Sequence, residues 1–131
     1  MSREYFIKNM KGILYYQEIP LLDFEIKNRE LVKGVDLSGQ KYWPPEIKVW
    51  GLSYVHLNDF FSRRVIPDNQ MLLHDYLQAM KLESYDFEEM IKRRNGTNGI
   101  DDYWVKFEGI GANTFEEIGT QKYPIYSEGT I

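Results

Sequence analysis

The sequence predicts a small α+β domain in which an antiparallel sheet packs on about three short helices. Three features support this prediction: alternation of apolar and charged residues near the N-terminus, helical periodicity in the middle of the chain, and a late aromatic-rich β segment. The chain has 131 residues, which is the usual length of one domain. We expect residues 1–108 to form this domain and residues 109–131 to form a C-terminal tail that can order against the sheet or a partner.

The N-terminal third predicts a three-stranded antiparallel meander. Residues 22–27 alternate apolar and charged side chains without interruption, which is typical of a strand with one face on a core and the other in water. The β-rich run 12–16 precedes this strand, and the run 30–35 follows it after a short turn. Residues 103–107 have the composition of a final strand. We expect that strand to return to the meander, because an isolated strand could not satisfy its backbone hydrogen bonds.

The segment 36–50 is expected to form a loop or an edge strand, because it contains Ser38-Gly39 and Pro44-Pro45. Three helices should follow it. Ser53 is the predicted N-cap of the first helix, which Pro67 should end.

The second and third predicted helices also carry cap signals. Asp68 can cap the second helix, and Asp86 opens the third within a capping-box pattern. Asn95-Gly96 supplies a left-handed C-terminal stop. The residues at helical spacing on the three helices are Leu57, Phe60, Phe61, Arg64, Leu73, Tyr76, Leu77, Met80, Met90 and Ile91.

Composition disfavours several classes of function. The net charge is −4, and the basic clusters at residues 63–64 and 92–94 each lie beside acidic residues, so direct nucleic-acid binding is not expected. The absence of cysteine excludes disulfides, thiolate metal sites and a cysteine nucleophile. The N-terminus lacks the apolar stretch of a signal peptide, and no run approaches the ~18 apolar residues of a membrane span. We therefore expect a cytoplasmic protein with no membrane contact.

Residues that could carry chemistry are few. Asp101 and Asp102 could hold a divalent metal, or they could cap a turn before the last strand, and the turn is the favoured interpretation. His56 and His74 have no nucleophile or further ligand at a suitable spacing. We therefore predict a protein that is not an enzyme and that uses no cofactor or metal.

Aromatic residues are abundant, with ten tyrosines, seven phenylalanines and three tryptophans. Most should lie in the core, and the remainder should form a binding face. Trp43 and Trp50 flank the proline pair, and each is either a lid on the core or an exposed interface anchor, with the lid favoured. The candidate protein-binding residues are Trp43, Trp50, Arg63, Arg64 and Trp104.

A series of motifs in the middle of the chain has a recognisable order. The tetrapeptide 58–61 (Asn-Asp-Phe-Phe) is followed by 65–68 (Val-Ile-Pro-Asp), a helix, the tetrapeptide 85–88 (Tyr-Asp-Phe-Glu), and a glycine loop and strand over 96–107. This order resembles the N-terminal subdomain of HipA-type serine/threonine kinases, best over residues 58–107. The motifs of the kinase body are not found, so the resemblance implies no kinase activity. It implies a stand-alone subdomain, similar to the small protein of three-part HipB–HipS–HipT systems, that docks on a separate kinase or on its helix-turn-helix antitoxin.

The sequence therefore predicts a non-catalytic protein-binding module, with a HipA-like kinase or its antitoxin as the partner. The alternative is a phage or mobile-element accessory protein that binds a host factor, with acidic side chains forming a negative face or simply a solvated helix face. A homo-oligomer formed through exposed strand edges is also compatible with the sequence. The acidic residues in question are Glu83, Asp86, Glu88, Glu89, Asp101 and Asp102.

Overall fold

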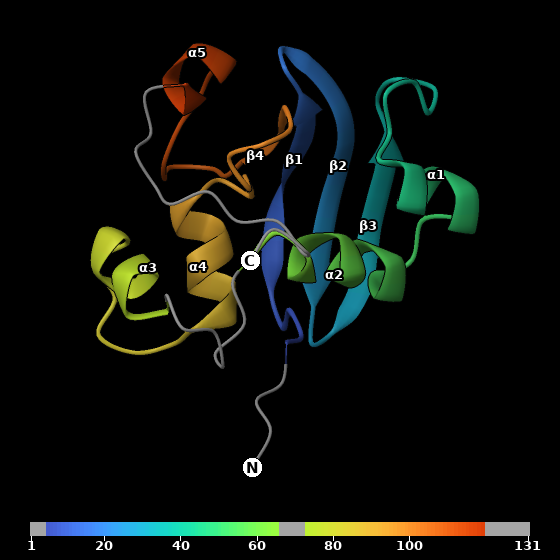
Figure 1. Cartoon of the computed structure of the whole chain (residues 1–131). Coiled ribbons are helices and arrows are strands. Elements are labelled where there is room, and N and C mark those ends of the chain that lie inside the picture. Colours follow the sequence, from blue (N-terminus) through green and yellow to red (C-terminus); the bar gives the residue numbers. More distant parts are fainter. Residues whose placement is uncertain (1–4, 66–72, 120–131) are drawn as a thin grey trace.

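The structure is a computed structural model that describes residues 5–65 and 73–119, without the side chain of Tyr76 (Figure 1). A four-stranded antiparallel sheet of order β3-β2-β1-β4 combines with short helices, so the predicted α+β fold is confirmed. The elements are β1 (Met10–Tyr16), β2 (Ile19–Lys27), β3 (Glu30–Asp36), α1 (Pro45–Trp50), α2 (Tyr54–Ser62), α3 (Leu73–Ala79), α4 (Phe87–Arg93), β4 (Tyr103–Lys106) and α5 (Phe115–Ile118).

One face of the sheet is buried under α2 and α4, as the period-two pattern predicts. Leu22, Phe24 and Ile26 of β2 are each at most 1% exposed and belong to the main core cluster. Asp23 lies between them on the opposite face, where it accepts the Lys33 ammonium at 2.9 Å. The alternation therefore separates a core face from a solvated face with paired charges.

The fourth strand returns to the meander, as predicted. β4 pairs antiparallel with β1, from Ile13↔Lys106 to Tyr16↔Tyr103. This return brings residues from the end of the domain beside its first strand.

The outer edge of β4 is closed by the turn that ends α4. The Asn95 carbonyl accepts the Val105 N–H at 2.7 Å, and Asn95 Nδ2 donates to the Val105 carbonyl at 3.1 Å. Asn95 (φ 52°) and Gly96 (φ 67°) take the left-handed conformation expected of the helix stop. No described segment other than β2 pairs with β3, which forms the opposite edge of the sheet.

The predicted starts of the first and third helices are confirmed by their capping bonds. Ser53 Oγ accepts the His56 N–H at 3.2 Å and starts α2. Asp86 Oδ1 accepts the Glu89 N–H at 3.1 Å and starts α4. On α3, Leu73 and Leu77 pack against the core, and Met80 is buried just beyond the helix end.

Two predictions about the helices are wrong. Residues 45–50 form α1 and not a loop or strand, because Pro45 occupies the first turn, where a missing N–H costs nothing and the fixed φ suits a helix. The helix α2 ends at Ser62 and not at Pro67, and the turn after it directs Arg64 toward the α4–β4 loop. Pro67 and the predicted cap Asp68 lie outside the described residues.

The segment after β4 folds back on the domain. Ala112 is buried, and its N–H donates to Asn95 Oδ1 at 3.2 Å. Thr114 then caps α5 by accepting the Glu117 N–H at 3.2 Å. Residues 120–131 of the predicted tail lie outside the description, and the domain boundary at residue 108 stays a prediction.

Among the described helices, none has the length and apolar character needed to span a bilayer.

Gly12 lies where β1 approaches β4 closely. A Cβ there would stand 2.7 Å from Val105 Cγ1 and 3.0 Å from the Lys106 carbonyl oxygen. We expect Gly12→Ala to lower the free energy of unfolding by about 1–3 kcal/mol, measured by urea denaturation, because β4 must shift. The matched control is Gly34→Ala, whose Cβ meets the end of the rotatable Leu52 side chain at 2.7 Å. Its expected effect is within about 1 kcal/mol, and equal losses in the two variants would contradict this account.

Candidate functional site

Large exposed apolar side chains gather where α1 meets α2. Val49 is 73% exposed, Trp50 is 71% exposed and Val55 is 60% exposed. We call these three residues the corner surface. The Leu52 side chain, between them in sequence, lies against Gly34 of β3, so the corner surface neighbours the β3 edge of the sheet. Figure 1 shows α1 beside β3 at this side of the molecule.

Local hydrogen bonds fix the shape of this corner. Gly51, at φ 93°, closes α1 by donating its N–H to the Ile47 carbonyl at 2.9 Å. His56 Nδ1 lies 2.8 Å from the Gly51 carbonyl, and since a carbonyl only accepts, Nδ1 carries the proton there. Ile47 is 1% exposed and anchors α1 in the core. Trp50 is therefore presented to solvent by a fixed turn between two anchored helices.

Trp43 does not belong to the exposed surface. It is 7% exposed, and its indole Nε1 donates to the Leu21 carbonyl at 3.2 Å. The lid interpretation of Trp43 is confirmed, and its assignment as an exposed interface anchor is wrong. For Trp50 the reverse holds, because the favoured lid interpretation is wrong and the residue is exposed.

Trp104 is likewise an internal residue. It is 1% exposed, stacks on Tyr15 with ring centroids 4.6 Å apart, and donates from Nε1 to the Gln17 carbonyl at 2.7 Å. Its neighbour Val105 belongs to the main core, whereas Trp104 lies on the other face of the sheet. The expectation that Trp104 is exposed for binding is wrong, because stacking and the indole bond hold it in the domain.

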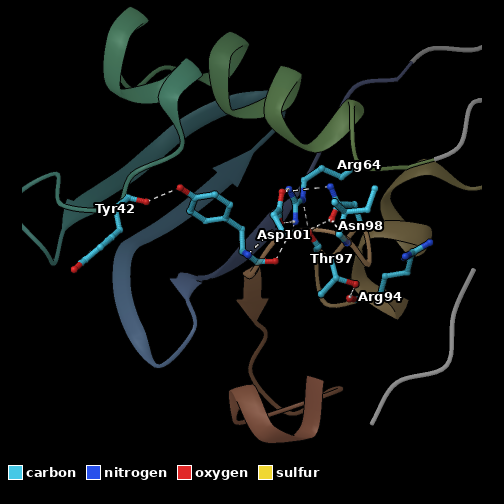
Figure 2. A network of polar contacts seen from close by, with 9 residues as sticks. Tyr42, Arg64, Arg94, Thr97, Asn98 and Asp101 are labelled. Atoms are coloured by element: carbon cyan, nitrogen blue, oxygen red, sulfur yellow. Dashed lines mark hydrogen bonds and ion pairs between the residues drawn. The ribbon is translucent and has the colours of Figure 1, made fainter. Parts of the chain in front are cut away.

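Arg64 is buried within a polar network and is not available as an interface residue (Figure 2). Its side chain is only 5% exposed, and it forms a bidentate pair with Asp101 in which both N–O distances are 2.7 Å. Arg64 Nε donates to the Gly96 carbonyl at 2.7 Å, and Nη2 donates to the Tyr103 carbonyl at 3.0 Å. The guanidinium also lies 4.7 Å from the Phe60 ring centroid. The surface assignment of Arg64 is therefore wrong, while Arg63, the C-cap of α2, is exposed as predicted.

The paired carboxylates build the turn before β4, which was the favoured interpretation. Asp101 Oδ1 accepts the Tyr103 N–H at 3.1 Å in addition to the Arg64 bonds. Asn98 Oδ1 accepts the Asp101 N–H at 3.1 Å, and Asp102 Oδ2 accepts Gln17 Nε2 at 2.8 Å. Within the ranges 5–65 and 73–119, no group of three or more histidine or carboxylate side chains could hold a metal ion.

Several of the acidic side chains considered as a negative face contribute to local structure. Asp86 caps α4, and Glu88 accepts the backbone N–H groups of Lys8 and Asn9. Asp101 is committed to the Arg64 network. These carboxylates therefore stabilise separate parts of the fold.

The hydroxyls of two half-buried tyrosines tie separate segments of the chain together. Tyr103 donates to the Tyr42 carbonyl at 2.8 Å, and Tyr54 donates to the Ile7 carbonyl at 2.8 Å. Desolvation raises the pKa of both phenols, and the Asp101 carboxylate raises the pKa of Tyr103 further. Both hydroxyls therefore stay protonated as donors at neutral pH.

The sequence did not identify Val49 and Val55 as surface residues. The adjacent pair Val49-Trp50 and the N-cap Ser53 shortly after it were the available signals. They would indicate an exposed corner only if residues 45–50 were recognised as a helix with Ile47 inward.

Comparison with known proteins yields no relative: no protein-family model, curated protein or solved structure matches the chain.

The ion pair between the buried Arg64 and the partly exposed Asp101 supplies a stability prediction. We expect Asp101→Ala to lower the free energy of unfolding by about 3 kcal/mol, because it leaves the Arg64 guanidinium buried without its counter-charge. The matched control is Asp23→Ala, which removes the partner of a cation that stays in solvent, since the Lys33 side chain is 42% exposed, and it should cost less than about 1 kcal/mol. Urea denaturation of both variants measures the difference, and similar losses would show that the Arg64 pair is no more important than a surface pair.

The raised tyrosine pKa values predict a loss of stability at alkaline pH. The unfolded chain releases these protons near the ordinary tyrosine pKa of 10.0, whereas the folded chain holds them to higher pH. Their contribution is therefore complete below this pH and declines as the pH rises through the folded-state pKa. Urea denaturation between about pH 8 and 11 should show a shallower decline for Tyr54→Phe/Tyr103→Phe than for the wild type. An equal decline in the double variant and the wild type would contradict this account.

Proposed function

We propose that this chain is a non-catalytic protein-binding module that contacts its partner through the corner surface. The supporting observation is the 71% exposure of Trp50 in a corner fixed by backbone hydrogen bonds. An exposed indole between two exposed valines is unfavourable in water and gains a large contact area when a partner covers it. Because the turn is already ordered, little conformational entropy is lost when the partner binds.

The proposed partner is a HipA-like kinase or its helix-turn-helix antitoxin in the cytoplasm. This choice is supported by the order of motifs over residues 58–107 and is an argument by analogy. The corner surface immediately precedes that segment in the chain, since Val55 lies in the first turn of α2. A module of this kind would act by occupying a surface of its partner, without a cofactor.

Capture of the partner from the native host tests the proposal. The tagged wild-type chain should retain one major protein, identified by mass spectrometry, and Trp50→Ala should reduce its recovery at least tenfold, as about 2 kcal/mol at a hot spot implies. The matched control is Ile110→Ala, an exposed apolar residue at 49% exposure outside the corner, which should retain the partner. Thermal unfolding should show both variants as folded as the wild type, because neither side chain belongs to the buried core.

The identity of the captured protein separates the alternatives. A HipA-like kinase or a helix-turn-helix protein supports the proposed partner. A different protein that still requires Trp50 supports the accessory-protein alternative. Equal recovery by the wild type and Trp50→Ala would show that the corner surface is not the interface.

A further inference from the structure

The sheet has one edge that remains open to another strand. At β4 the backbone of Val105 is bonded to Asn95 on the side away from β1. At β3 no described strand is hydrogen-bonded to the corresponding side, and every residue of the strand except Leu31 is exposed. An open strand edge is a template for a further strand, because its outward N–H and C=O groups lack backbone partners.

The exposed side chains of β3 suit an added strand. Val32 is 52% exposed and Val35 is 44% exposed. Lys33 pairs with Asp23 across the solvated face of the sheet at 2.9 Å, and its side chain is still 42% exposed. An ammonium has three donors, so Lys33 can also meet a carboxylate on an added strand. The β3 edge therefore offers backbone N–H and C=O groups without a strand partner, beside the exposed Val32 and Val35 and the charged Lys33.

A second copy of this chain does not fit that edge. If two β3 strands paired antiparallel over their full length, Glu30 of each would face Asp36 of the other, and the two Lys33 residues would face each other. Like charges directly opposite each other destabilise a strand pair.

We infer that β3 binds an extended segment of a different protein by antiparallel strand addition. The charge pattern of β3 specifies the segment: a carboxylate opposite Lys33, cations opposite Glu30 and Asp36, and apolar or β-branched residues between them. This inference rests on the proposed protein-binding function and gives its binding mode. Because Leu52 lies against Gly34, a strand added at β3 would run beside the corner surface, and one partner could contact both.

Two synthetic peptides test the charge pattern directly. The peptide Lys-Val-Thr-Glu-Val-Val-Lys complements β3 in antiparallel register, and Glu-Val-Thr-Lys-Val-Val-Glu carries the inverted charges. Nuclear magnetic resonance titration should show the first peptide shifting the amide signals of residues 30–36 and binding about tenfold tighter than the second, as three inverted cross-strand charge pairs imply. Lys33→Glu should weaken the first peptide about fivefold. Equal affinities, or shifts confined to other strands, would overturn the inference.

A designed dimer tests whether the edge is open, independently of any peptide. In Glu30→Lys/Lys33→Val, full-length antiparallel pairing of two copies would place opposite charges at both ends and remove the central repulsion. Sedimentation velocity should show this variant as a dimer. The control Glu18→Lys/Lys41→Val changes the net charge equally at exposed positions outside β3 and should stay monomeric.

A monomeric Glu30→Lys/Lys33→Val variant would show that β3 does not accept a strand. Neither assay uses the natural partner, so this failure leaves the Trp50→Ala test of the proposed function unaffected. Conversely, if the Trp50→Ala test shows that the corner surface is not the interface, the expected peptide and dimer results stay the same.

Discussion

The buried guanidinium of Arg64 is the constraint around which the C-terminal half of the domain is organised. A charge taken out of water must be paired and fully hydrogen-bonded, and Arg64 obtains this from Asp101, Gly96 and Tyr103. Gly96 lies in the turn after α4, Asp101 lies in the loop before β4, and Tyr103 is the first residue of β4. One side chain at the end of α2 thereby fixes the position of the whole α4–β4 connection.

That connection determines which edge of the sheet is available. With Gly96 held by Arg64, the preceding Asn95 can bond the Val105 backbone and close the β4 edge. The β3 edge has no comparable neighbour among the described residues. The difference between the two edges follows from the packing of this polar network, which closes the β4 edge, while the β3 edge has no second strand partner among the described residues.

The three tryptophans show how local hydrogen bonds divide core from surface. Trp43 and Trp104 are buried because each indole N–H reaches a backbone carbonyl within the domain, at Leu21 and Gln17 respectively. A buried indole without such a partner would carry a desolvation penalty. Trp50 is the last residue of α1, whose inward position is already filled by Ile47, and its ring remains in solvent. The corner surface, which includes Trp50, lies next to the β3 edge, so both candidate surfaces are on the same side of the molecule (Figure 1).

The sequence by itself determined the features that depend on neighbours in the chain. Alternation in residues 22–27 predicted β2, and Ser53, Asp86 and Asn95-Gly96 predicted the ends of α2 and α4, because strand periodicity and capping bonds act over a few residues. The tertiary structure alone decided the burial of Trp43, Arg64 and Trp104. Their partners lie 22, 37 and 87 residues away, and no local pattern records which distant carbonyl or carboxylate the folded chain will bring within reach.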